Sequence, residues 1–238
     1  MHIQLGEIEI VVTHKAIKHV HLSVHPPLGR VTLVAPTDTC IDVVRAYAIS
    51  KLGWIREQQI KLRNQAREMP RQFIEGESHY LWGHRYLLSI VEQDVKPSVT
   101  LDHRCIRLQV RPGSNQSKCA EVIHNWHKEL LHQVIPVFIR HWEERLSVKV
   151  AAYFLQHMKT RWGSCNPRKG HIRLNTELVK KPKHLLEYVI VHEMIHLIEP
   201  THNDSFITIL DEHYPHWREV RVELNALPLT AEEWQVND

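Results

Sequence analysis

The sequence contains little cysteine, and what it has is dispersed. Only four of its 238 residues are cysteine, at Cys40, Cys105, Cys119 and Cys165. Because no two of them have C-x-x-C spacing, the pattern argues against both a disulfide framework and a zinc site built from cysteine. The sequence also lacks internal repeats and low-complexity segments, which argues against a solenoid or a linker-rich protein.

Long apolar runs and targeting features are missing as well. No stretch approaches the roughly 20 apolar residues that a membrane helix needs, so we expect no membrane partner. The first ten residues alternate polar and apolar side chains, without a basic region before an apolar core. We therefore expect no signal peptide and, with the cysteine pattern, a cytoplasmic location.

Strong net charge is a third absence. The formal net charge is only +3, but it is unevenly spread. Residues 159–183 hold eight basic side chains and one acid, and residues 199–238 hold nine acids and two arginines. These segments are either two solvated faces that attract each other or a basic wall that favours anionic substrates. No nucleic-acid-binding motif lies in the basic stretch, so we expect no nucleic-acid partner.

What remains is the composition of an ordinary globular protein, with 43% hydrophobic and 24% charged residues. Residues 3–12, 17–25 and 30–35 alternate apolar and polar side chains, which predicts a three-stranded antiparallel meander. A helix is expected from residue 41 to about residue 67, with Trp54, Ile55 and Ile60 as its buried stripe.

The middle of the sequence predicts more strands and then a long helix. A hairpin over residues 80–92 should turn at Gly83-His84, and strands should follow near 98–102 and 104–110. Helical spacing runs from residue 118 to about residue 146. We place a domain boundary near residue 114, giving a β-rich part with one helix over 1–114 and a metal-binding part over 115–238.

The C-terminal part should combine strands and helices. Strands are predicted over about 148–158 and over 171–175, and helices over about 203–212 and 216–226. The helix between them begins near His184 and should end before Pro200. The predicted fold class is therefore α+β.

This last helix carries the sequence His192-Glu193-Met194-Ile195-His196, an H-E-x-x-H motif. Four residues advance about 400° around a helix, so His192 and His196 lie one turn apart on nearly the same face. Two imidazoles so placed can bind one Zn²⁺, although other divalent metals also fit. Glu193 points off that line and is placed to deprotonate a water on the metal.

The motif could be a metal site, or its two histidines could be surface residues, since the sequence contains 20 histidines. The surroundings of the motif favour the metal site. The helix is apolar in almost every other direction, and such a helix is buried. Buried ionisable groups need a partner, and a divalent cation supplies one. His202 offers a third nitrogen ligand, and it competes with the downstream acids Glu199, Asp204, Asp211, Glu212, Glu219 and Glu223.

Several motifs in order resemble the YgjP-like family of bacterial predicted metal-dependent hydrolases, also called M48-like or minigluzincin-type metallopeptidase domains. They are Arg161-Trp-Gly-Ser-Cys165, Ile172-Arg-Leu-Asn175, Tyr188 to His196, His202 with Phe206, and Pro215-His-Trp217. The resemblance covers the whole length, and its specific motifs lie in 158–225. Family members commonly have Ser after the third histidine and Phe-Trp later, where this sequence has Asn203 and Phe206-Ile207.

The resemblance implies a zincin-like core, in which a small sheet packs on helices and the H-E-x-x-H motif lies on a buried one. Carried over by position, His192, His196 and His202 are the metal ligands and Glu193 is the catalytic acid/base. Family members include predicted peptidases and nucleotide (UTP) pyrophosphatases.

Two further residues are candidates for substrate binding. Arg161 could bind a carboxylate or phosphate in a forked pair, and Asn175 ends strand 171–175, whose edge could pair with an extended peptide. The structural alternative is that Trp162 packs on the metal helix and Gly163 permits close approach of the backbone.

Three functions remain to be separated. The first is a zinc metallopeptidase in which Glu193 acts as general base and then acid on a peptide substrate. The second is a nucleotide pyrophosphatase acting on a small anionic substrate, although the sequence has no glycine-rich phosphate loop and no carboxylate cluster for Mg²⁺. The third is a non-catalytic zinc-binding interaction protein.

Overall fold

The computed structural model describes residues 1–25, 29–64, 71–158 and 161–227. Within these residues it contains α-helices, short mixed sheets and one 3-10 helix, so the fold is α+β as predicted. The chain divides into two compact units, Met1–Ala66 and Arg67–Asp238, which are described separately. Within the described residues, no helix is both long enough and apolar enough to cross a membrane.

The first unit is built on a four-stranded sheet in the order β1-β2-β4-β3, from β1 (His2–Leu5), β2 (Ile8–Lys15), β3 (His21–His25) and β4 (Arg30–Pro36). The predicted antiparallel meander is wrong in two respects. The chain turns at Gly6, which has a positive φ of 63°, so residues 3–12 form a hairpin rather than one strand. β2 then pairs in parallel with β4, which separates it from β3.

Two helices cover this sheet, α1 (Ile41–Ser50) and α2 (Leu52–Asn64), with a break at Lys51 where one helix was expected. Ile55 is fully buried in the core of the unit. Trp54 and Ile60 are 42% and 55% exposed, so the predicted buried stripe is wrong for both. The expected helix end near residue 67 lies outside the described residues.

The second unit begins with a sheet in the order β5-β6-β8-β7, from β5 (Ser78–Leu81), β6 (His84–Glu92), β7 (Ser98–Leu101) and β8 (Cys105–Val110). The predicted hairpin is confirmed, but its turn is Trp82-Gly83, one residue earlier than the expected Gly83-His84, because His84 already pairs with Leu81. The long helix α3 (Gln116–Leu146) starts at Asn115, whose side chain accepts a hydrogen bond from the Lys118 backbone N–H.

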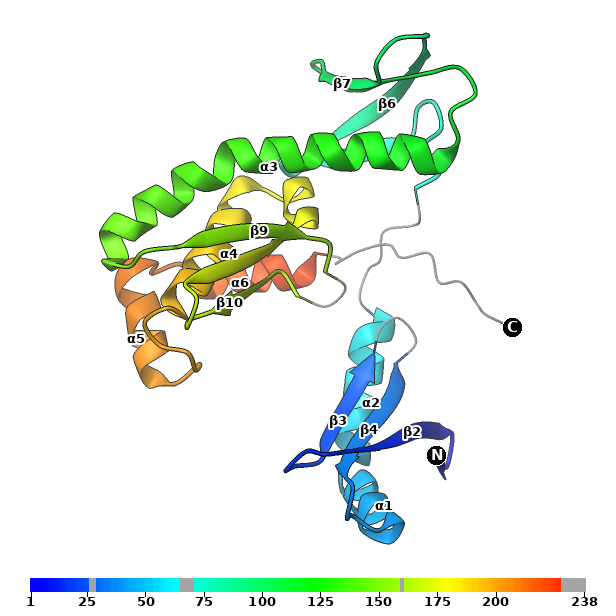
Figure 1. Cartoon of the computed structure of the whole chain (residues 1–238), viewed down its shortest axis with the longest axis vertical. Helices are drawn as coiled ribbons and strands as arrows, with labels where there is room; N and C mark the ends of the chain where they lie inside the picture. The colour runs from blue at the N-terminus through cyan, green and yellow to red at the C-terminus, as the bar shows by residue number, and fades with distance from the viewer. Residues whose placement is uncertain (26–28, 65–70, 159–160, 228–238) are drawn as a thin grey trace. The chain divides into compact units, whose positions relative to one another are not determined.

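Helix α3 connects the two halves of the second unit (Figure 1). Its first part packs against β8 through Cys119 and Ile123. Its later part joins the main core through Leu131 and Ile135. The expected boundary at residue 114 therefore falls inside this unit, between two elements that share a core.

The second sheet of this unit has the order β10-β11-β9, from β9 (Ala152–Gln156), β10 (Gly163–Asn166) and β11 (His171–Asn175). β10 pairs antiparallel and β9 parallel with β11. β11 is therefore the central strand, so the hypothesis that strand 171–175 offers a free edge to a peptide is wrong. β9 and β10 are the outer strands, and β10 was not predicted as a strand.

A 3-10 helix, η1 (Thr176–Lys180), leads into α4 (Lys183–Ile195), and α5 (Asp204–His213) and α6 (Trp217–Ala226) follow. The apolar side chains of α4 are buried from Leu185 to Ile195. They form the centre of a core to which β11, α3, α5 and α6 also contribute. Figure 1 shows α4 between β9, β10 and α6, below α3.

Candidate metal centre

The last turn of α4 places the H-E-x-x-H residues. His192 and Glu193 belong to the helix, and His196 is the C-cap residue with φ −62° and ψ −15°. The helix therefore ends five residues before Pro200, earlier than the proline alone predicts. The His192 and His196 rings still lie close together, with centroids 5.0 Å apart and planes at 87°, because His196 keeps helical backbone angles.

His202 reaches the same place from the turn that follows. Asn203 caps α5 by accepting a hydrogen bond from the Phe206 backbone N–H, which fixes the residue before it at the start of that helix. The Nε2 atoms of His202 and His192 are 3.0 Å apart, and the ring of His202 is 4.6 Å from that of His196. All three histidines offer ligand atoms within 4.8 Å of one another.

Phe206 packs against all three imidazoles. Its ring centroid lies 5.0 Å from that of His192 and 4.8 Å from those of His196 and His202. The side chain is 1% exposed and joins the main core. One side of the histidine cluster is therefore packed against a buried aromatic ring that is fixed in the core.

The electrostatics of the cluster favour neutral imidazoles. The pKa of His192 is lowered to about 3, mainly by burial and also by the neighbouring His196, His202 and Arg221. Burial also lowers the pKa of His196. A neutral imidazole keeps one nitrogen lone pair, which is the form that binds a metal.

A hydrogen bond selects which nitrogen of His196 carries that lone pair. Its Nδ1 lies 3.1 Å from the backbone carbonyl oxygen of Glu199. A carbonyl oxygen can only accept, so Nδ1 carries the proton and Nε2 is left as the ligand atom. In His192, the buried Nδ1 has no hydrogen-bond partner among the described residues.

Glu193 follows His192 in the chain, but its carboxylate is not part of the group of ligand atoms that the three histidines form. The residue is 6% exposed, and burial raises the pKa of its carboxyl to about 8, an effect that the charge of Arg161 partly opposes. Gly163, the first residue of β10, packs directly on this carboxyl. The expectation that Gly163 allows a close backbone approach is confirmed, because no side chain fits there.

The two candidate substrate-binding residues have different environments. Arg161 is exposed, and its guanidinium makes no hydrogen bond or ion pair with the described residues. Asn175 is fully buried, and its side chain bonds only to backbone groups of Met158, Arg161 and Glu177. Because these bonds use both its donors and its acceptor, Asn175 has a structural role here rather than direct contact with a substrate.

None of the six competing acids belongs to the group of three histidines, and three of them make other contacts. The carboxylate of Glu199 accepts hydrogen bonds from the backbone and side chain of Thr201. Asp211 accepts from Trp217 and Arg218, and Glu223 pairs with His184 at 2.8 Å. The hydroxyl of Tyr214 donates to the backbone oxygen of His184, near the opposite end of α4 from the histidine cluster.

Sequence reasoning did not identify Arg221 as a neighbour of this cluster. It lies on α6, where its guanidinium is 5.9 Å from the ring of Trp217 and its charge acts on His192. Residues 192 and 221 lie on different helices, so no local spacing in the sequence links them.

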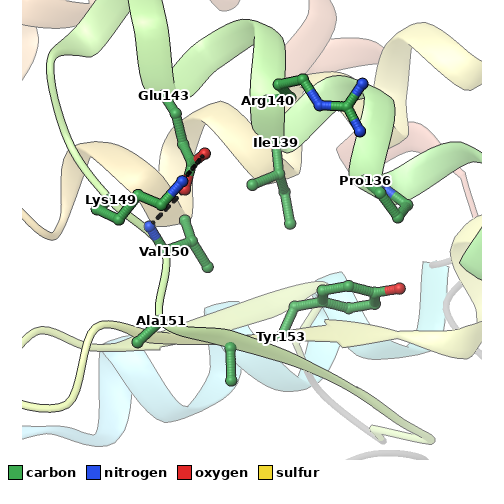
Figure 2. A pocket seen from close by; sticks show the side chains of 9 residues that line it. Pro136, Ile139, Arg140, Glu143, Lys149, Val150, Ala151 and Tyr153 are labelled. Carbon is green, nitrogen blue, oxygen red and sulfur yellow. Dashed lines mark hydrogen bonds and ion pairs between the residues drawn. The ribbon is translucent and has the colours of Figure 1, made fainter.

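A groove of about 650 Å³ lies away from the histidines, between α3 and the start of β9 (Figure 2). Its carboxylate, Glu143, is already bonded to the Lys149 side chain and the Val150 backbone N–H. Neither Glu193 nor any histidine of the cluster lines it. The groove therefore has no catalytic constellation, and the candidate site is the histidine cluster at the end of α4.

One family model and two solved structures are similar to this chain. A family model described as YgjP-like, metallopeptidase domain, matches residues 18–227. Among solved structures, the abylysin zymogen of Pyrococcus abyssi is 18% identical, covering 38% of this chain and 91% of that chain with a TM-score of 0.36. The jannalysin zymogen of Methanocaldococcus jannaschii is 22% identical, with coverages of 38% and 92% and a TM-score of 0.34. No curated protein matches the sequence.

Proposed function

Because this chain belongs to the YgjP-like metallopeptidase family, we propose that it is a zinc-dependent peptidase with its active site at the end of α4. His192, His196 and His202 hold the ion, and Glu193 is the general base and acid. The observation that carries the proposal is the convergence of three imidazoles whose ligand atoms lie within 4.8 Å of one another.

The donor set suits zinc in number and in type. Catalytic zinc sites have three protein ligands and one open position, and imidazole nitrogen is a preferred ligand. Nitrogens that share a tetrahedral zinc lie about 3.4 Å apart, since each is about 2.0–2.1 Å from the ion. The 3.0 Å between the Nε2 atoms of His192 and His202 needs only a small adjustment.

The chain also orients its ligands. The Glu199 carbonyl holds the proton of His196 on Nδ1, so that Nε2 faces the cluster. Phe206 packs on all three rings and limits their rotation. The position of the third ligand, His202, depends on the turn after α4. The Asn203 cap fixes the end of that turn at the start of α5.

When bound, zinc supplies Lewis acidity that lowers the pKa of water toward about 7 and polarises a scissile carbonyl. Glu193 then takes a proton from the attacking water and returns it to the leaving amine. Its buried carboxyl, packed under Gly163, is held in one position for both transfers. Peptide bonds are the proposed target because amide hydrolysis requires a proton for the leaving nitrogen.

The test uses purified protein whose zinc content has been measured. Wild type and Glu193→Gln are assayed against a peptide library and, separately, against nucleoside triphosphates including UTP. We expect peptide cleavage by wild type, a loss of roughly 100- to 10,000-fold in Glu193→Gln, and unchanged zinc content.

Two results would change the proposal. Release of phosphate products without peptide cleavage would identify a nucleotide pyrophosphatase. If wild type with one bound zinc turns over neither substrate class, the zinc-binding interaction protein is the better description. Chelation followed by addition of zinc provides the metal control.

A further inference from the structure

Asn175 joins the end of the central strand β11 to the segment before β10. Its Nδ2 donates to the backbone oxygens of Met158 and Arg161, each at 2.8 Å. Its Oδ1 accepts from the backbone N–H groups of Met158 and Glu177, at 3.4 and 3.1 Å. The backbone N–H of Asn175 donates to the oxygen of Trp162 at 2.9 Å. A single buried asparagine thus fixes the backbone at Met158 and at Arg161 and Trp162.

Trp162 and Gly163, which follow Arg161, are held by contacts of their own. Trp162 packs partly buried against the main core, and the ammonium of Lys181 lies 5.7 Å from its ring centroid. Gly163 lies on the carboxyl group of Glu193. The backbone of Arg161 is therefore held between Asn175 and the strand that covers the general base.

The side chain of Arg161 is not used by the fold. It is exposed and makes no hydrogen bond or ion pair with the described residues. Arg161 lies two residues before Gly163, which packs on the carboxyl group of Glu193, so its side chain starts beside the candidate active site. A guanidinium with five donors and no carboxylate partner is suited to bind a planar anion in a forked pair.

From this arrangement we propose that Arg161 determines specificity by binding a substrate carboxylate next to the scissile bond, and that Asn175 is the residue that positions it. This inference rests on the proposed peptidase function. The carboxylate comes either from an acidic side chain or from the C-terminus of the peptide, since both present the same group.

The test compares matched fluorogenic peptides built on a sequence that wild type cleaves. One pair differs only by Glu or Gln on either side of the bond, and a second pair differs only by a free or an amidated C-terminus. Wild type should cleave one carboxylate-bearing member roughly 10- to 100-fold faster in kcat/KM, mainly through KM. The pair that shows the preference identifies the source of the carboxylate.

Arg161→Gln should remove this preference, so that the ratio of kcat/KM between the two members of the pair falls to about one. The matched control is Arg168→Gln, an exposed arginine in the turn between β10 and β11 within the same basic stretch. Arg168→Gln should retain the preference if the specific position matters. It should lose part of it if general positive charge is responsible, and that result would overturn the proposal.

Asn175→Ala should also reduce the ratio between the two members of the pair, while one zinc remains bound. A merely structural loss would lower both rates equally and leave the ratio unchanged, and would refute the positioning role. Because Asn175 is buried, Asn175→Ser, which keeps a hydroxyl donor, is measured as well and should give an intermediate ratio.

A binding measurement separates this inference from the proposed function. The same peptide pairs are titrated against zinc-loaded Glu193→Gln, with and without Arg161→Gln. Peptide cleavage by wild type with equal affinities within each pair would overturn the role of Arg161 alone. If wild type cleaves no peptide, the proposed function fails and this inference fails with it.

Discussion

Gly163 lies directly against the carboxyl group of Glu193. A Cβ atom at residue 163 would come within 2.6 Å of Oε1, 2.7 Å of Cγ and 2.9 Å of Cδ of that side chain. Such distances are shorter than van der Waals contact, so Glu193 keeps its position only because residue 163 is glycine. The first residue of β10 thereby forms one wall of the candidate active site.

Gly163→Ala should therefore lower kcat without removing the zinc. The new methyl group must push the Glu193 carboxyl aside, and a displacement of about 1 Å in a catalytic group can cost about 100-fold in rate. The measurements are kcat on a cleaved peptide and zinc content by elemental analysis.

Gly53→Ala is the matched control for this change. Gly53 lies in α2, and a Cβ there would meet no atom within 4 Å. We expect unchanged kcat and a gain of about 1 kcal/mol in helix stability. Equal losses of kcat in both variants would contradict the proposed contact.

His202→Ala should weaken zinc binding on the order of 100- to 1000-fold, because it removes one of three nitrogens from the cluster. Competition with a chromophoric chelator measures this affinity without any substrate. His216→Ala serves as control, since the His216 side chain is 82% exposed. Unchanged zinc affinity in His202→Ala would show that another residue supplies the third ligand.

A third prediction concerns acid stability and His127. This histidine is 6% exposed, and its Nε2 has no hydrogen-bond partner among the described residues. Its pKa is lowered to about 3, mainly by burial and also by the charges of Lys180, His79 and His124. Because the folded pKa lies below the ordinary value of 6.5, the stabilising contribution is complete above pH 6.5 and is lost as the pH falls toward 3.

His127→Leu should remove this pH dependence. Between pH 7 and pH 4, its free energy of unfolding should fall by about 3 kcal/mol less than that of wild type, measured by urea denaturation. His103→Gln, at an exposed position, should behave like wild type. Parallel curves for wild type and His127→Leu would mean that His127 is not buried as the neutral form.

Gly83→Ala should destabilise the second unit. Gly83 has φ +83°, and a Cβ there would lie 2.7 Å from Cγ of Pro182, just before α4. Gly76→Ala is the control, because Gly76 also has a positive φ, +76°, but a Cβ there would meet no atom within 4 Å. Gly83→Ala should cost about 1–3 kcal/mol more than this control in thermal unfolding.

The sequence was most informative where function depends on local spacing. His192 and His196 lie four residues apart, and helix geometry alone brings their rings together. His202 could be proposed because only six residues separate it from His196, too few to carry it far from the cluster. The Asn115 and Asn203 caps follow from the same kind of local chemistry.

Features that depend on pairing between distant segments were not predictable. The parallel pairing of β2 with β4 cannot be read from alternation, which reports the faces of a strand but not its neighbours. For the same reason strand 171–175 was expected at an edge, although β10 and β9 enclose it. β10 itself has only four residues and begins with glycine, so it carries no alternating apolar signal.

The role of Asn175 shows the same limit for a single residue. An asparagine at the end of a strand suggests an exposed polar group, because this residue type is mostly exposed. Its partners are backbone groups of Met158 and Arg161. Backbone groups are the same in nearly every residue, so the sequence does not mark these two as partners. Only the folded chain shows that its side chain is fully engaged.

The turn between β5 and β6 has a practical consequence for constructing a minimal enzyme. The Trp82 and Gly83 amides donate to the backbone oxygens of Val179 and Lys180, and Leu81 is 1% exposed in the main core. A truncated protein starting at residue 115 would lack both hydrogen-bond donors to the segment before α4. It would also have a cavity in the main core at the position of Leu81. The shortest autonomous catalytic fragment must therefore begin upstream of β5.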